Sequence, residues 1–100
     1  MDGEARFEEL CEERNGDLVR TKMMGMPSLK LNGKLVAGFT AAEDAMVFKL
    51  PGADDRSRAL ALPGAHLFEP MEGRAMKEWV VVPNEQAQHW PALAQTAIGA

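Results

Sequence analysis

The stretch from Met23 to Leu50 decides the fold, and it reads MMGMPSLKLNGKLVAGFTAAEDAMVFKL. Strand-like runs follow one another closely here, and Asn32-Gly33 joins two of them. A type I′ turn needs a positive φ at both central residues, which Asn and Gly tolerate, so this dipeptide predicts a two-residue hairpin. The stretch therefore predicts an antiparallel β-meander at the centre of the chain.

Strands are expected on both sides of this hairpin, bounded by turn residues. Pro27 cannot donate a ladder hydrogen bond, which favours a bulge or a sheet edge at Gly25-Met26-Pro27. The segment before it is either a first strand or the approach to one. The runs we assign are 18–24 with that reservation, 28–31, 34–40, 45–50, the short run 66–68 and the clear strand 75–82.

Helical spacing appears at both ends of the chain. Near the N-terminus, Phe7, Leu10 and Cys11 share an apolar stripe, with Asp2 as the expected cap and Asn15-Gly16 as the end. A short helix is expected over 54–62, closed by Pro63-Gly64. After Pro83, Asn84 can cap a last helix, in which Pro91 either kinks a longer helix or sits in the first turn of a shorter one. The apolar face of that helix carries Ala87, Trp90, Leu93, Ala94, Ala97 and Ile98.

This order of elements predicts a single two-layer α+β domain over residues 1–100, because strands joined by tight turns pair antiparallel and terminal helices cover one sheet face. We expect about five strands in the sheet. Segments 45–50 and 77–82 carry apolar residues on both sides. We therefore expect the sheet face away from the helices to be partly covered, and a homodimer through that face would do so.

Composition narrows the class of protein. The net charge of −4 and the pI of about 5.1 argue against a nucleic-acid binder overall, although a local basic face would escape this test. One cysteine excludes an internal disulfide, and with only two histidines a zinc site is not expected. The acidic N-terminus does not resemble a signal peptide, and no apolar run reaches the length of a membrane helix. We expect a cytoplasmic protein without a metal or other cofactor.

Several motifs resemble the TfoX N-terminal domain family. Segments 22–27 (KMMGMP), 31–38 (LNGKLVAG) and 46–50 (MVFKL) are similar to the family's K-M-F-G start, V-N-G-K-M-F-A-G hairpin and lvlRL strand. Segments 62–65 (LPGA), 68–71 (FEPM), 73–74 (GR) and 76–83 (MKEWVVVP) are similar to its lPGa..FePM.GRpMkEYvvlP block. The order and spacing agree over roughly residues 20–98, with Met24 where the pattern often has Phe and Trp79 where it often has Tyr.

That resemblance implies a two-layer fold with a curved antiparallel sheet. It also implies kinship with the YjbR/MmcQ-like domains, for which DNA binding has been suggested. The best-known relatives are regulators of natural competence that carry a second, helical domain, whereas stand-alone members mostly have no assigned activity.

Charged and aromatic residues on the expected strands form the candidate binding patch. Lysine and arginine suit anionic groups, and methionine and tryptophan suit adaptable or flat apolar contacts. The alternative is that the lysines merely solubilise an exposed sheet face. The patch consists of Lys22, Met24, Lys49, Arg74, Lys77 and Trp79.

No catalytic constellation is recognisable. Glu69 and Glu72 beside Arg74 are better explained as a turn with an ion pair than as an acid–base pair. His66 and His89 lack a metal-ligand spacing, and Cys11 has acidic neighbours that would not activate a thiol. Nor does any glycine-rich run precede a Lys-Ser/Thr pair, as a phosphate loop requires.

We therefore expect a non-catalytic domain that binds a macromolecule, foremost a protein, in a regulatory role. One alternative is a nucleic-acid-binding wing module in transcription regulation. Another is a small-molecule site or an unrecognised enzyme activity in a cleft between the sheet and segment 63–74.

Overall fold

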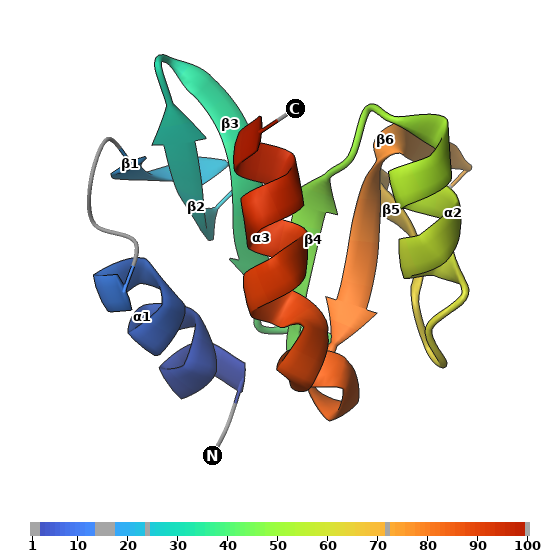
Figure 1. The fold of residues 1–100 in the computed structure, drawn as a ribbon, viewed down its shortest axis with the longest axis horizontal. Coiled ribbons are helices and arrows are strands. Elements are labelled where there is room, and N and C mark those ends of the chain that lie inside the picture. The colour runs from blue at the N-terminus through green and yellow to red at the C-terminus, as the bar shows by residue number, and fades with distance from the viewer. Residues whose placement is uncertain (1–2, 14–17, 24, 72, 100) are drawn as a thin grey trace.

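The protein is described from a computed structural model over residues 3–13, 18–23, 25–71 and 73–99, with the backbone alone at Glu13, Met23, Pro70, Met71, Arg74 and Ala75 (Figure 1). The elements run α1 (Gly3–Glu13), β1 (Leu18–Met23), β2 (Met26–Leu31), β3 (Lys34–Thr40), β4 (Ala45–Lys49), α2 (Ala53–Leu60), β5 (His66–Met71), β6 (Arg74–Pro83), the 3-10 helix η1 (Asn84–His89) and α3 (Trp90–Gly99).

All strands belong to one antiparallel sheet in the order β1-β2-β3-β4-β6-β5. The α+β class and the antiparallel sheet are thus confirmed. The sheet has six strands rather than about five, because Leu18–Met23 is a full strand and not an approach to one.

The hairpin that Asn32-Gly33 predicted is present. Asn32 has φ 52° and Gly33 has φ 82°, the left-handed pair that a type I′ turn requires, and the turn joins β2 to β3. Leu31 pairs with Lys34 on either side of it. This turn sets the register of the central meander.

Pro27 lies inside β2 opposite Lys22 and has no paired residue on β3, so β2 is locally a sheet edge at this position, as one of the two alternatives held. The pairing of β2 with β3 begins only at Ser28↔Gly38, and the missing N–H of Pro27 therefore breaks no bond to β3. A bulge follows two residues later, between Leu29 and Lys30. There Val36 of β3 is an extra residue between the pairs Leu29↔Ala37 and Lys30↔Leu35.

The three α-helices cover one face of the sheet. In Figure 1, α3 crosses in front of the middle strands, α1 lies to its left and α2 lies beside β6. The main core fills the space between the layers, and its largest fully buried side chains include Trp90, Phe7 and Phe48. Trp90 also donates its indole N–H to the Val82 carbonyl oxygen at 3.1 Å, which anchors the last helix to β6. Pro91 sits in the first turn of α3, as one of the two alternatives held.

The opposite sheet face carries a second, smaller cluster. Ala45, Val47, Phe68, Trp79 and Val81 are buried there, with Met26, Leu35 and Met76 partly buried around them. The β5–β6 register jumps from Leu67↔Val80 to Phe68↔Met76, and such irregularities bend a sheet and increase its twist. The apolar residues that suggested a homodimer through this face are therefore already buried within one chain.

The β3–β4 turn is hydrogen-bonded to the first residue of α1 and to the first residue of η1. Asp44 Oδ1 accepts the Gly3 N–H at 2.9 Å, at the first residue of α1. Its Oδ2 accepts from the Asn84 side-chain amide at 3.1 Å, and its carbonyl oxygen accepts the Asn84 backbone N–H at 3.0 Å. Asn84 was expected to cap the last helix, but η1 has no side-chain cap and Asn84 donates to Asp44 instead. The expected caps at Asp2 and Asn15-Gly16 lie outside the described residues.

Candidate functional site

Among the patch residues that the structure describes, Lys49 and Trp79 are brought together and Lys22 lies apart from them. Lys49 and Trp79 pair across β4 and β6 on the face of the smaller cluster, and Trp79 is only 7% exposed. Lys77 is exposed on β6. It belongs to residues 77–79, which have no paired residue on β5 because the register passes from Leu67↔Val80 to Phe68↔Met76. Lys22 lies on β1, with β2 and β3 between it and β4. Met24 and the Arg74 side chain lie outside the described part of the structure.

Lys22 also lies on the other face of the sheet. Side chains alternate along a strand, so Lys22 shares its face with Leu18 and Arg20. That is the helix-covered face, because Arg20 reaches α1: its Nη1 and Nη2 donate to the two carboxylate oxygens of Glu8 at 2.6 and 2.7 Å. The Arg20 guanidinium also lies 5.6 Å from the centroid of the Phe7 ring.

The outer side of β1 is an open sheet edge in the described part of the chain, since β1 ends the strand order and pairs only with β2. Among the described residues, the large hydrophobic side chain that is exposed belongs to β1: Val19 is 58% exposed. A free strand edge presents unpaired N–H and C=O groups that can template another strand. Of the described strands, β5 ends the sheet at the other side and pairs only with β6, but the exposed large hydrophobic side chain lies on β1, so the β1 edge is the one better suited to contact a partner.

The positions of the free backbone groups on β1 follow from Pro27. In an antiparallel pair, directly opposite residues alternate between exchanging two hydrogen bonds and exchanging none. Pro27 has no N–H, so its pair with Lys22 is of the second kind. The backbone groups of Leu18, Arg20 and Lys22 therefore point away from β2, toward the open edge. The two-residue turn after Leu31 gives the same result. The Leu31↔Lys34 pair that closes it exchanges hydrogen bonds between β2 and β3, so the backbone groups of Leu31 point away from β1 and its partner Leu18 makes no bond to β2.

The sequence segment that contains β1 is rich in cations, while α1 brings Glu8 and Glu12 to a pocket that Leu18 and Arg20 also line. Residues 18–42 contain Arg20, Lys22, Lys30 and Lys34 and no aspartate or glutamate, although the whole chain has a net charge of −4. This segregation is visible in the sequence and could have identified the β1 edge, but the net charge conceals it. Lys22 is exposed and makes no ion pair with any described residue, whereas Arg20 is held by Glu8.

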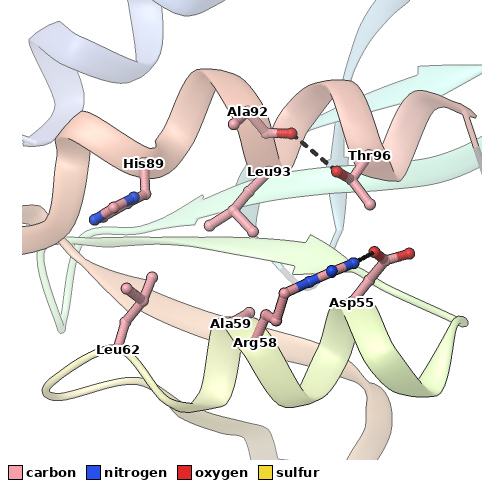
Figure 2. Close-up of a pocket in the computed structure, with 8 residues that line it drawn as sticks. All are labelled: Asp55, Arg58, Ala59, Leu62, His89, Ala92, Leu93 and Thr96. Carbon is pink, nitrogen blue, oxygen red and sulfur yellow. Dashed lines mark hydrogen bonds and ion pairs between the residues drawn. The ribbon is translucent and has the colours of Figure 1, made fainter.

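A groove between α2 and the C-terminal helices is the second feature. It has a volume of about 380 Å³. Figure 2 shows Leu62 and Leu93 pointing into it from opposite sides, with His89 at one end and Arg58 directed toward Asp55 at the other. The Arg58–Asp55 pair measures 2.6 Å, and the Thr96 hydroxyl donates to the Ala92 carbonyl oxygen at 3.0 Å. The groove residues come from Asp55–Leu62 and His89–Thr96, not from segment 63–74, where a cleft was expected.

The titratable groups of the described structure do not form a catalytic set. Burial raises the pKa of the Cys11 thiol, and the nearby Glu8 and Glu12 carboxylates raise it further against the opposing effect of Arg20. A thiol with a raised pKa is a poor nucleophile at neutral pH. In residues 3–13, 18–23, 25–71 and 73–99 no group of three or more His, Cys, Asp or Glu side chains is placed to hold a metal ion.

His66 is held through both of its ring nitrogens. Its Nδ1 lies 2.9 Å from the Leu67 carbonyl oxygen and its Nε2 lies 2.7 Å from Glu43 Oε1. Only the imidazolium has an N–H on both nitrogens. The bond to the Leu67 carbonyl, followed by the bond to the Glu43 carboxylate, raises the pKa of His66 above 6.5 despite some desolvation. The pair joins the start of β5 to the β3–β4 turn.

Comparisons of this chain with protein-family models, with curated proteins and with solved structures returned no match. The likeness to the TfoX N-terminal family stays a prediction. Each described helix is too short or too polar to cross a membrane.

Proposed function

We propose that this protein is a non-catalytic binding domain whose partner is another protein, recognised by strand addition at the open edge of β1. The single observation that supports it is the free edge itself. Strand addition uses main-chain N–H and C=O groups, which only a polypeptide can supply in the required register. Leu18, Arg20 and Lys22 direct these groups outward, and Val19 offers an exposed apolar contact beside them.

A regulatory role in the cytoplasm accords with this proposal. The TfoX resemblance points to regulation, and the single cysteine accords with a reducing compartment. Binding through an edge strand changes no covalent bond, so the function needs no catalytic group or cofactor.

Site-specific photo-crosslinking tests the proposal. A photoreactive amino acid replaces Val19 in cells that naturally express the protein, and Ser57, which is exposed on α2, is the control position. We expect one discrete protein adduct from position 19 and none from position 57. Adducts at position 19 that contain only nucleic acid, or that match the control, would refute the proposal.

Two substitutions at Lys22 then distinguish strand addition from side-chain contact. Lys22→Pro removes an outward N–H without removing a bond to β2, whereas Lys22→Ala keeps that N–H. We expect the proline variant to lose the purified partner and the alanine variant to keep most of its affinity. Circular dichroism and thermal unfolding establish that both variants remain folded. Equal affinity of the two variants contradicts binding at this edge.

The α2–α3 groove supports a second candidate, the binding of a small molecule. Its volume of about 380 Å³ falls within the usual range for ligand sites, and its walls join Leu62 and Leu93 to the polar Arg58 and His89. A fragment screen read by two-dimensional NMR tests it. Shifts at Leu93 and His89 that disappear in Leu93→Gln support a ligand site here, and a screen without such shifts rejects it.

A further inference from the structure

We propose that the strand added to β1 is an acidic segment of the partner protein, with carboxylates on the face shared by Arg20 and Lys22 and an apolar side chain beside Val19. This inference rests on the proposed function, which says only that a polypeptide strand binds there.

The charges of the edge carry the inference. The charged side chains of β1 are Arg20 and Lys22, which share one face of the strand; Lys30 of β2 lies opposite Val19, on the other face. Directly opposite residues of neighbouring strands have Cβ atoms about 5 Å apart, close enough for opposite charges to attract and like charges to repel. An added strand with carboxylates at alternate positions therefore matches this edge, and a basic strand does not.

Glu8 shows within the chain that this edge accepts carboxylates. It binds Arg20 through two short hydrogen bonds from the helix-covered side. Lys22, two residues further along and on the same face, has no such partner among the described residues. A carboxylate of the added strand placed across from Lys22 would complete this row of ion pairs.

A second copy of this chain fits the edge poorly. Antiparallel pairing of two β1 strands, in the registers centred on the strand, places Arg20 across from Arg20 or from Lys22 of the other copy. Like charges directly opposite destabilise a strand pair. The same cations that favour an acidic strand therefore discourage self-association.

Nucleic acid also fits less well. The described hairpin of β1 and β2 exposes no aromatic side chain for base stacking. Phosphate oxygens accept from the cations and from the outward N–H groups, but they supply no donor for the outward carbonyl groups of Leu18, Arg20 and Lys22.

A display library of random octapeptides provides the test. It is panned against the whole protein and counter-selected against Lys22→Pro, so that the surviving peptides depend on the edge. We expect aspartate and glutamate at alternate positions of the survivors, with valine, isoleucine or leucine between them. A selected peptide and its Glu→Gln and Glu→Lys counterparts are then titrated by fluorescence anisotropy.

Charge reversal gives the quantitative result. Lys22→Glu should weaken the acidic peptide roughly five- to tenfold and should strengthen the lysine counterpart by a similar factor. Ser57→Glu, which adds a negative charge at an exposed position on α2, should change the affinity less than about twofold. Single- and double-stranded oligonucleotides at low salt are titrated in parallel.

The outcomes separate the two proposals. Survivors that are neutral or basic, but still lost with Lys22→Pro, overturn the acidic strand and leave strand addition standing. The absence of any peptide sensitive to Lys22→Pro overturns the proposed function as well. A third outcome is that oligonucleotides bind, that Lys22→Glu abolishes this binding, and that no peptide binds. It would assign the edge to nucleic acid and overturn both proposals.

Discussion

Replacement of Asp44 should destabilise the fold strongly, although the residue is exposed in a turn. Its side chain connects three parts of the chain: the β3–β4 turn, the start of α1 through the Gly3 N–H, and the start of η1 through the Asn84 amide. Asp44 also adopts a left-handed conformation with φ 50°. Asp44→Ala removes both side-chain hydrogen bonds and places a residue that disfavours positive φ at this turn.

The magnitude follows from these three terms. Loss of a carboxylate at a helix N-terminus costs about 1 kcal/mol, loss of the bond to Asn84 costs about 1 kcal/mol, and the left-handed alanine costs about 1 kcal/mol more. We therefore expect Asp44→Ala to lower the free energy of unfolding by about 3 kcal/mol. Asp44→Gly should cost about 2 kcal/mol, because glycine relieves the backbone term alone.

Asp44→Asn should cost less than about 1 kcal/mol. The new amide oxygen can still accept the Gly3 N–H. The Asn84 amide can then turn its Oδ1, which accepts no bond in the described structure, toward the new amide nitrogen. The three variants should therefore rank alanine, glycine and asparagine from least to most stable.

Urea unfolding followed by tryptophan fluorescence measures these differences, since Trp79 and Trp90 are both buried. Gly3→Ala provides a cross-check, because its Cβ would clash with Asp44 Oδ1 and would displace the carboxylate. The double variant should then cost clearly less than the two single changes together. An Asp44→Ala protein within about 0.5 kcal/mol of the original, or strict additivity with Gly3→Ala, would refute this account of the turn.

The other predictions concern His66, Cys11 and Trp90. The folded-state pKa of His66 is raised, so its stabilising contribution is complete below about pH 6.5 and is lost as the pH rises through the folded-state pKa. Urea unfolding between about pH 5.5 and 8.5 should therefore show a falling free energy of unfolding. Glu43→Gln should make that fall smaller. Buried Cys11, with its raised pKa, should react with a disulfide reagent far more slowly in the native protein than in urea, and equal rates would contradict its burial. Trp90→Phe leaves the Val82 carbonyl without its indole donor and leaves a cavity, so calorimetry should record a loss of about 3 kcal/mol; a loss below about 1 kcal/mol would contradict this.

The sequence was most informative where local chemistry decides the structure. Asn32-Gly33 specified its own turn, and the turn set the register of the meander from Leu31↔Lys34 onward. Alternation along β4 correctly divided Met46 and Phe48 from Val47, and these residues belong to different clusters on the two sheet faces. The extent of β1 and the start of β2 were misjudged, because proline is tolerated inside a strand wherever no neighbouring strand bonds to its nitrogen.

The candidate site was much less predictable. Lys22 and Lys49 look alike in sequence, as lysines on strands, but strand order and side-chain alternation place them on different faces with two strands between them. Trp79 was expected at a binding surface and is packed in the smaller cluster. The groove of Leu62, Leu93 and His89 joins residues from α2 and the C-terminal helices, whose proximity no local pattern encodes.

The sequence by itself determined the kinds of element, their order and the antiparallel hairpin, because turn geometry and apolar periodicity act over a few residues. Tertiary structure alone decided which strands ended the sheet, which cation lacked a carboxylate partner among the described residues and which apolar face was already covered. Those properties depend on pairing between distant segments, as when Glu8 meets Arg20 or Asp44 meets Asn84, and such pairing is set by the packing of the whole chain.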